Sequence, residues 1–255
     1  MLSDFLVSEL FAFLLVFCRL GTALMVMPGF SEIYVSTRIR LFLALTFSLI
    51  LAPTIKTLPA LPPEIFGLTS LIIAEILTGF LIGTMTRMMI SAIHMAGMII
   101  AYQSSLSSAI IPDVTQNQGG QGSVLGNMLA MSAIVIIFAS DTHHLMLRGI
   151  ADSYTLFMPG KMPMVEDFAN QASRVMSGAF EMSMKLSAPH LVVGMVLYLG
   201  AGVLARLMPN MQIFFIMIAP QLLISFFIFM IVISTLLMWY LDYFRETLGG
   251  FLYGG

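Results

Sequence analysis

An all-α, polytopic membrane-type fold of long, bent helices and helical hairpins is predicted by three features of the 255-residue sequence. Hydrophobic residues make up 59% of the chain and charged residues only 9%, whereas soluble domains carry about 25% charged residues. The mean hydropathy of +0.98 indicates more apolar surface than a soluble fold of this size can bury. Residues 207–241 contain no charged side chain. As one helix this stretch would measure about 52 Å, well beyond the roughly 30 Å hydrocarbon core of a bilayer.

The apolar segments are separated by proline, glycine and polar residues. They are expected at 5–27, 39–51, 64–111, 124–140, 145–158, 191–204 and 213–241. Pro28-Gly29 ends the first, and the proline-rich linker 53–63 cannot be helical. The proline-free segment 64–111 is either a hairpin or one unusually long bent helix, with 83–87 as the expected interruption. Segments 124–140 and 145–158 are short for full membrane spans.

An amphipathic helix is predicted at 165–186. Its apolar side chains recur at about the 3.6-residue spacing of a helix, and the opposite face carries Arg174, Glu181 and Lys185. Glu181 and Lys185 form an i,i+4 pair in the favourable order. This helix should therefore meet water on one side, and the tail after residue 241 reads as a mildly polar, glycine-rich end.

Several classes of function are not expected. The net charge of −2 and the absence of basic runs give no footprint for nucleic-acid binding. Asp4, Glu9 and Arg19 are inconsistent with a secretory signal peptide, and the single cysteine, Cys18, cannot form a disulfide within the chain. No nucleophile elbow, phosphate-binding glycine loop or zinc-protease motif is present. We therefore expect neither an enzyme nor a cofactor.

Ionisable residues inside apolar segments are costly and usually face protein or water. For Arg19, two interpretations stay open: snorkelling or a backbone carbonyl partner, and a role between subunits. Glu75, Gly79, Gly83 and Arg87 share one helix face, where small residues allow close helix approach. Glu75 and Arg87 are too far apart to pair with each other. His94 is expected to bond to a neighbouring helix rather than to serve a proton relay.

The sequence Asp141-Thr-His143-His144 has the donor types of a metal site. Adjacent histidines on a helix point about 100° apart, and no cysteine or second carboxylate completes a ligand set. No metal site is therefore expected here.

The order and spacing of several motifs resemble the FliR family, the export-gate subunits of flagellar type III secretion, which have injectisome counterparts. The resemblance spans residues 15 to about 230. It is carried by Arg19, Pro28-x-Phe30, Arg38-x-Arg40-x-x-x-Ala44, Pro53, Glu75-x-x-x-Gly79-x-x-x-Gly83, Ala96-Gly97-x-x-Ile100-x-x-Gln103, His144, Pro159-Gly160 and Gly202-x-x-x-Arg206-x-x-Pro209-x-x-x-Ile213-Phe214.

The resemblance implies a non-enzymatic subunit in the bacterial inner membrane, within the flagellar basal body. Its partners would be FliP-, FliQ- and FlhB-like subunits, lipid, and unfolded exported proteins in transit through a helical pore assembly. Residues 1–255 would form a single export-gate domain, with a FliP-like part at about 1–185 and a FliQ-like helical hairpin at about 186–255. A stand-alone polytopic small-solute transporter is the alternative, although the inverted repeats typical of transporters are not found. Flagellar and injectisome membership both remain open.

The resemblance also implies that the central loop, about residues 106–122, lies in the closed pore as a plug. A plug needs apolar bulk and a tether that can move aside, and 107–112 and 116–122 have these compositions. The plug residues by resemblance are Leu106, Ser108, Ile110, Ile111, Pro112, Gly119, Gly120 and Gly122. Residues expected to serve helix packing or assembly are Arg19, Pro28, Arg40, Glu75, Gly79, Gly83, Gly97, Gln103, Arg206, Pro209 and Phe214.

Overall fold

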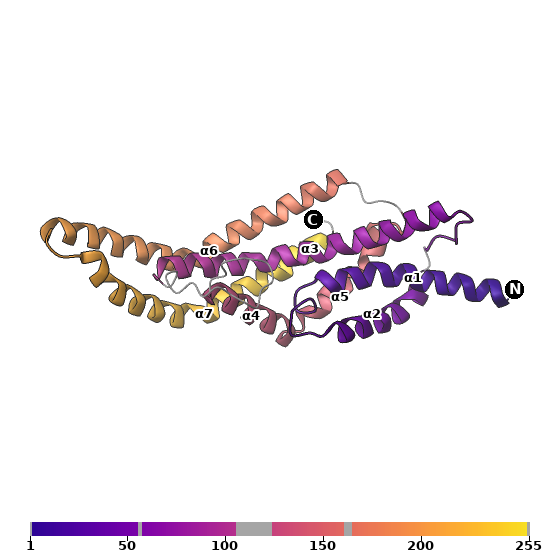
Figure 1. Ribbon diagram of the computed structural model, residues 1–255, viewed down its shortest axis with the longest axis horizontal. Helices are drawn as coiled ribbons and strands as arrows, with labels where there is room; N and C mark the ends of the chain where they lie inside the picture. The colour runs from indigo at the N-terminus through magenta and orange to yellow at the C-terminus, as the bar shows by residue number, and fades with distance from the viewer. Residues whose placement is uncertain (1, 56–57, 106–123, 161–164, 254–255) are drawn as a thin grey trace. The chain divides into compact units, whose positions relative to one another are not determined.

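The described part of the chain consists of helices joined by turns and linkers and contains no strand. A computed structural model describes residues 2–55, 58–105, 124–160 and 165–253, shown in Figure 1. The predicted all-α class is confirmed.

The helices divide between two compact units. The first unit comprises Met1–Met89, Ser140–Met176 and Arg245–Gly255, and the second comprises Ile90–Ala139 and Ser177–Phe244. Three helices contribute residues to both units: α3 (Ile65–Gln103), α6 (Val165–Leu207) and α7 (Ile213–Tyr253). Each unit therefore combines segments that lie far apart in the sequence.

The first unit begins with two neighbouring helices, α1 (Leu2–Val26) and α2 (Thr37–Leu51), which lie side by side in Figure 1. The chain turns at Pro28-Gly29, where Gly29 has a φ of 83°, a conformation that glycine adopts without steric cost. Ser36 caps α2 by accepting a hydrogen bond from the Ile39 amide. A short 3-10 turn, η1 (Ala52–Thr54), follows at Pro53. These boundaries match the predicted first two segments.

The core of this unit is apolar along one side of α1. The side chains of Leu15, Val16, Leu20, Ala23, Leu24 and Met27 are almost completely buried. The unit also contains the first part of α3 and α5 (Thr142–Leu156).

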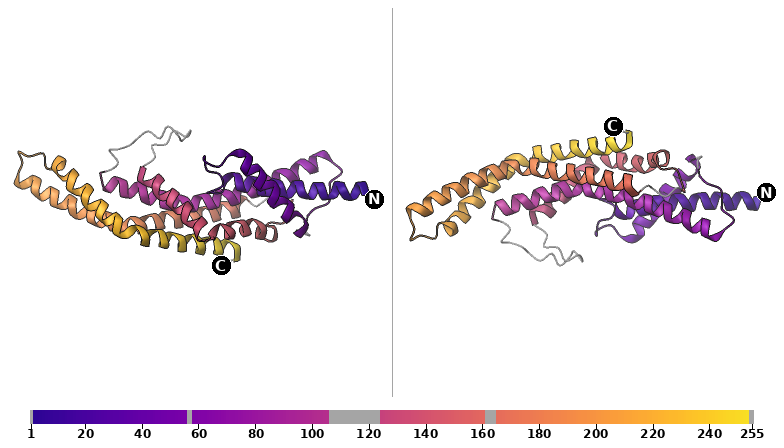
Figure 2. Two further views of the ribbon diagram at one scale, coloured as in Figure 1. Left: turned by 90° about the horizontal axis from the view of Figure 1, so that it is seen from below. Right: turned by 90° about the horizontal axis from the view of Figure 1, so that it is seen from above.

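The second unit contains α4 (Val124–Ala139), the end of α3, and a helical hairpin made by α6 and α7. Both views of Figure 2 show the two arms of the hairpin running alongside each other. The turn holds Pro209, and the Met211 amide donates to the Met208 carbonyl at 3.2 Å. The chain therefore reverses at the proline that opens the charge-free stretch.

Of the two interpretations of 64–111, one unusually long helix is confirmed and the hairpin with a break at 83–87 is wrong. The other long helices also extend beyond the predicted segments. Helix α3 runs without a break through 83–87, α6 joins the predicted segments 165–186 and 191–204, and α7 continues through the expected tail to Tyr253. Pro189 and Pro220 lie inside α6 and α7. A proline in a helix removes one hydrogen bond at a cost of about 3 kcal/mol, which the packing of long helices can offset.

Within the described residues, five helices are long and apolar enough to cross a membrane, by length and composition: Val7–Val26, Thr37–Thr54, Ile65–Gln103, Glu166–Leu207 and Phe215–Gly250. Helices α4 and α5 pass the same test only together, as one broken span. Their shortness agrees with the prediction for 124–140 and 145–158.

Candidate functional site

Some of the predicted site residues lie outside the described part of the chain. They are the plug residues Leu106, Ser108, Ile110, Ile111, Pro112, Gly119, Gly120 and Gly122. The side chain of Phe214 is not described either. Of the remaining candidates, Arg19, Glu75, Gly79, Gly83, Gly97 and Gln103 lie at contacts between helices, and Pro28, Arg40, Arg206 and Pro209 lie outside these contacts.

The centre of the first unit holds a buried ion pair between α1 and α3. Arg19 Nε donates to Glu75 Oε2 at 2.6 Å, and Arg19 Nη2 donates to Glu75 Oε1 at 3.1 Å. The two side chains are 1% and 0% exposed. This bidentate geometry is the strongest form of arginine–carboxylate pairing.

The remaining polar atoms of the pair are also bonded. Arg19 donates to the Ser153 carbonyl at 3.2 Å and to the Phe157 carbonyl at 3.3 Å, and its guanidinium carbon lies 4.0 Å from the centre of the Tyr154 ring. Glu75 Oε1 accepts from the Gly160 amide at 2.9 Å. The pair therefore ties α1 and α3 to the end of α5 and the turn that follows it.

Of the two interpretations of Arg19, this network bears on the first, a backbone carbonyl partner. The expected carbonyl partners are present, but the sequence analysis missed the carboxylate partner. Arg19 and Glu75 are opposite charges in two apolar segments, and this was the available signal, because buried charges are normally paired. Arg87 lies elsewhere, with Nη1 at 3.3 Å from Ser31 Oγ.

Two glycines of α3 lie against α1. A Cβ at Gly79 would collide with the Arg19 carbonyl oxygen and with Thr22 Oγ1. A Cβ at Gly83 would stand 2.8 Å from the Ala23 carbonyl oxygen. The missing side chains thus let the two backbones approach, and this approach places Glu75 within reach of Arg19.

A second close approach lies in the second unit, between α3 and α4. A Cβ at Gly97 would stand 2.5 Å from the Gly126 Cα atom. One turn earlier, His94 Nε2 lies 3.0 Å from Asn127 Oδ1. The expected hydrogen bond from His94 to a neighbouring helix is therefore present.

Gln103, the last residue of α3, connects to both arms of the hairpin. Its carbonyl accepts a hydrogen bond from Gln221 Nε2 at 2.5 Å, and the same Gln221 nitrogen lies 3.5 Å from the Tyr198 hydroxyl. The Gln103 side chain fills the space beside Gly194, where a Cβ would overlap with it. A single residue thus contacts α6 and α7.

The other predicted assembly residues lie away from these contacts. Pro28 forms the turn between α1 and α2, and Arg40 Nη2 donates to the Glu32 carbonyl at 2.6 Å. Arg206 is exposed in the last turn of α6, where a cation complements the helix dipole. Pro209 lies in the hairpin turn.

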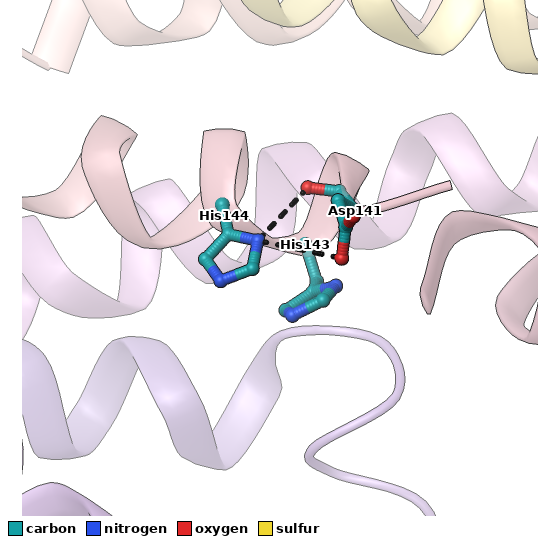
Figure 3. Close-up of side chains that lie close together, drawn as sticks. All are labelled: Asp141, His143 and His144. Atoms are coloured by element: carbon teal, nitrogen blue, oxygen red, sulfur yellow. Dashed lines mark hydrogen bonds and ion pairs between the residues drawn. The ribbon is translucent and has the colours of Figure 1, made fainter. Parts of the chain in front are cut away.

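The structure brings Asp141, His143 and His144 together at the start of α5, as Figure 3 shows. The rings of the two histidines lie 4.1 Å apart, centre to centre. The expectation that their side chains diverge is therefore wrong, because their rotamers turn the rings toward each other. These residues form the only group of metal-binding side chains within the described residues.

Comparison of the sequence with known proteins places the chain in a family. The family described as "Bacterial export proteins, family 1" matches residues 10–247. The flagellar biosynthetic protein FliR of Caulobacter vibrioides is 33% identical over 92% of this chain and 93% of its own. FliR of Bacillus subtilis is 27% identical over 88% and 87%. The Yop proteins translocation protein T of Yersinia pestis is 23% identical over 84% and 82%. The chain therefore belongs to the bacterial export proteins of family 1, the FliR family.

Proposed function

We propose that this protein is a non-enzymatic subunit of the bacterial flagellar type III protein export gate, located in the inner membrane within the flagellar basal body. The observation that carries the proposal is the 33% identity to a flagellar FliR over nearly the whole length of both chains. The 23% identity to the Yop translocation protein makes injectisome membership the weaker alternative. A stand-alone small-solute transporter is not favoured, because the relatives carry names from flagellar biosynthesis or protein translocation.

In this proposal the chain forms a pore together with FliP- and FliQ-like subunits, with an FlhB-like subunit alongside, and unfolded flagellar proteins pass through it. Long helices with uncovered apolar faces support such an assembly. Only 11% of the most apolar window of Phe215–Gly250 is buried within the chain itself. Phe215, Phe227 and Met230 are each at least 64% exposed, so lipid or other subunits must cover them.

We further propose that about 1–185 corresponds to a FliP-like part and about 186–255 to a FliQ-like hairpin. The α6–α7 hairpin supports the second part of this division, since a hairpin with apolar outer faces can pack beside similar hairpins of other subunits. The boundary near 185 rests on the resemblance, because α6 is continuous there.

The central loop, residues 106–122, is proposed to plug the closed pore. The proposal rests on the resemblance and on composition: 107–112 supplies apolar bulk, and 116–122 is uncharged. A pore wide enough for an unfolded chain must be sealed against ions when idle.

The export function is tested by deleting the gene and measuring flagellar proteins in the culture medium. Export should stop and should return when the intact chain is supplied. Co-purification of FliP- and FliQ-like subunits with the chain should accompany rescue. Normal export in the deletion strain would overturn the proposed function.

The plug is tested separately by replacing residues 108–118 with a glycine-serine linker of equal length. The complex should still assemble and co-purify, while the membrane becomes leaky to small ions. A matched control replaces only 116–118 and leaves the apolar residues in place. Unchanged ion tightness in the full replacement would contradict the plug and would leave the export function intact.

A further inference from the structure

We propose that the turn between α4 and α5 binds one divalent transition-metal ion, of the type of Zn²⁺, through Asp141, His143 and His144. One ligand atom from each residue lies within 4.8 Å of the other two. His144 Nδ1 stands 3.8 Å from Asp141 Oδ1, and Figure 3 shows both imidazoles on the same side of the turn as the carboxylate. This site is independent of the export-gate proposal.

The Asp141 carboxylate and both histidines lie at the start of one helix, α5. Asp141 has a φ of 58°, in the left-handed region, which aspartate adopts more often than most residues other than glycine. It stands at the N-cap of α5, yet its side chain makes no capping hydrogen bond. The carboxylate is thus available to a ligand instead of serving the helix.

The turn is anchored on both sides of Asp141. Arg245, from the end of α7, donates through Nε to Thr142 Oγ1 at 3.0 Å and through Nη2 to the Ser140 carbonyl at 3.2 Å. Donors held in place before binding lose less entropy when the ion arrives. The Arg245 charge offsets that of Asp141, so the imidazole nitrogens must supply much of the affinity.

The donor set selects the class of ion. Zinc binds imidazole nitrogen and carboxylate oxygen at about 2.0–2.2 Å, so bound ligand atoms stand about 3.3–3.6 Å apart. A separation of 4.8 Å must close by about 1.2–1.5 Å to reach this spacing, which is less than about 1 Å for each of the two donors when both move. Calcium and magnesium prefer all-oxygen sites and fit poorly. Asp141 and His144 have 81% and 70% of their side-chain surface exposed, so an ion can enter from solvent and water can fill the fourth position.

A simpler interpretation is that His144, when protonated, forms only a surface ion pair with Asp141. Under that interpretation the three side chains do not form a zinc site, and removing His143 has no effect on bound zinc. Under the proposal the protein binds one zinc, and removing His143 weakens that binding.

The test is equilibrium dialysis of the purified full-length protein, carrying an affinity tag without histidines, against zinc chloride, with bound zinc measured by mass spectrometry. We expect one zinc per chain. His144→Ala and Asp141→Asn, both at exposed positions, should each weaken binding by at least about tenfold, the smaller of the losses seen when even an outer-shell partner is removed. His143→Ala should do the same.

Asp152→Asn is the matched control, because Asp152 is a carboxylate of the same helix that pairs with Arg148. It should bind zinc as the unmodified protein does. Cobalt should give the absorption of a tetrahedral complex, and this absorption should disappear in His144→Ala. Substoichiometric zinc in the unmodified protein, or equal affinity with and without His143, would overturn the proposed site.

Discussion

At the scale of single residues, the Arg19–Glu75 pair is the most consequential contact in the first unit. Both charges have left water, and each is stabilised mainly by the other and by backbone groups of 153–160. The net worth of such a pair against an apolar replacement is small, whereas an uncompensated buried charge is strongly destabilising. The folded state is therefore stable only when α1 and α3 bring Arg19 and Glu75 together.

Removing one partner should reveal this asymmetry. Glu75→Gln leaves the Arg19 guanidinium buried without a counter-charge and should destabilise the protein by about 3–5 kcal/mol. The measurement is thermal unfolding of the detergent-solubilised protein. Lys185→Gln, which breaks the exposed Glu181–Lys185 pair, is the control and should leave the unfolding temperature unchanged.

The double replacement Arg19→Met with Glu75→Leu should recover much of the lost stability, because no buried charge then remains. A double variant as unstable as Glu75→Gln would mean that shape, rather than charge, governs this contact.

The pairing of Arg19 with Glu75 could not be predicted from any local pattern in the sequence. Both members of the pair were recognised as costly residues, but they lie 56 positions apart. Their pairing depends on the approach of α1 to α3, which no local pattern encodes. Side-chain rotamers likewise decide that His143 and His144 face each other.

At the scale of helices, close backbone approach at glycine holds α3 against its neighbours. In Gly97→Val the new side chain would meet the backbone of Gly126, and backbone cannot move aside cheaply. We expect a loss of about 1–3 kcal/mol, the usual cost of overpacking, measured by unfolding in detergent. Gly200→Ala is the control, because nothing lies within 4 Å of that position. It should be neutral or slightly stabilising, and equal losses in both variants would contradict the close-packing argument.

The contact of Gln103 with the hairpin makes a second prediction at this scale. Gln221→Leu removes the donor to the half-buried end of α3 and leaves the Gln103 carbonyl without it. A fully buried unsatisfied acceptor costs about 1–3 kcal/mol, so the half-buried Gln103 carbonyl should cost about 1 kcal/mol. Limited proteolysis should then cut the hairpin faster than in the unmodified protein. The variant Gln221→Asn keeps the amide on a shorter side chain and so tests whether the length of the Gln221 side chain is needed for the bond. An unchanged cleavage rate in Gln221→Leu would show that the bond is dispensable.

Helix boundaries were predictable where proline or glycine fixes the backbone, as at Pro28-Gly29, Pro53 and Pro209. Helix continuity was not. Gly83 suggested a break, but it serves packing against α1, and Pro189 lies inside a helix that continues past it. In long helices, the helical residues on both sides and the packing against other helices outweigh the low helix preference of a single glycine or proline.

At the scale of the whole molecule, many apolar side chains are not buried in the chain's own core. The buried share of the most apolar windows ranges from 11% to 44% among the five candidate spans. The sequence predicted a membrane protein for this reason, and the structure shows which side chains remain uncovered.

The uncovered surface predicts dependence on partners. Produced alone, the chain should extract into detergent with a broad size-exclusion profile. Co-expression with its FliP- and FliQ-like subunits should give a single sharp peak and a higher unfolding temperature, because the partners bury apolar side chains. Co-expression with an unrelated membrane protein is the control. A sharp peak and an equal unfolding temperature for the isolated chain would contradict this dependence.

The first unit is assembled from segments that are synthesised at different times. Its segments come from the beginning, the middle and the last eleven residues of the chain, and Arg245 in the last segment fixes Ser140 and Thr142 in the middle one. The unit that contains the amino-terminal helices is therefore incomplete until Arg245 and the residues after it have been synthesised. A premature stop just before residue 245 would therefore leave a nascent protein that lacks part of its first unit.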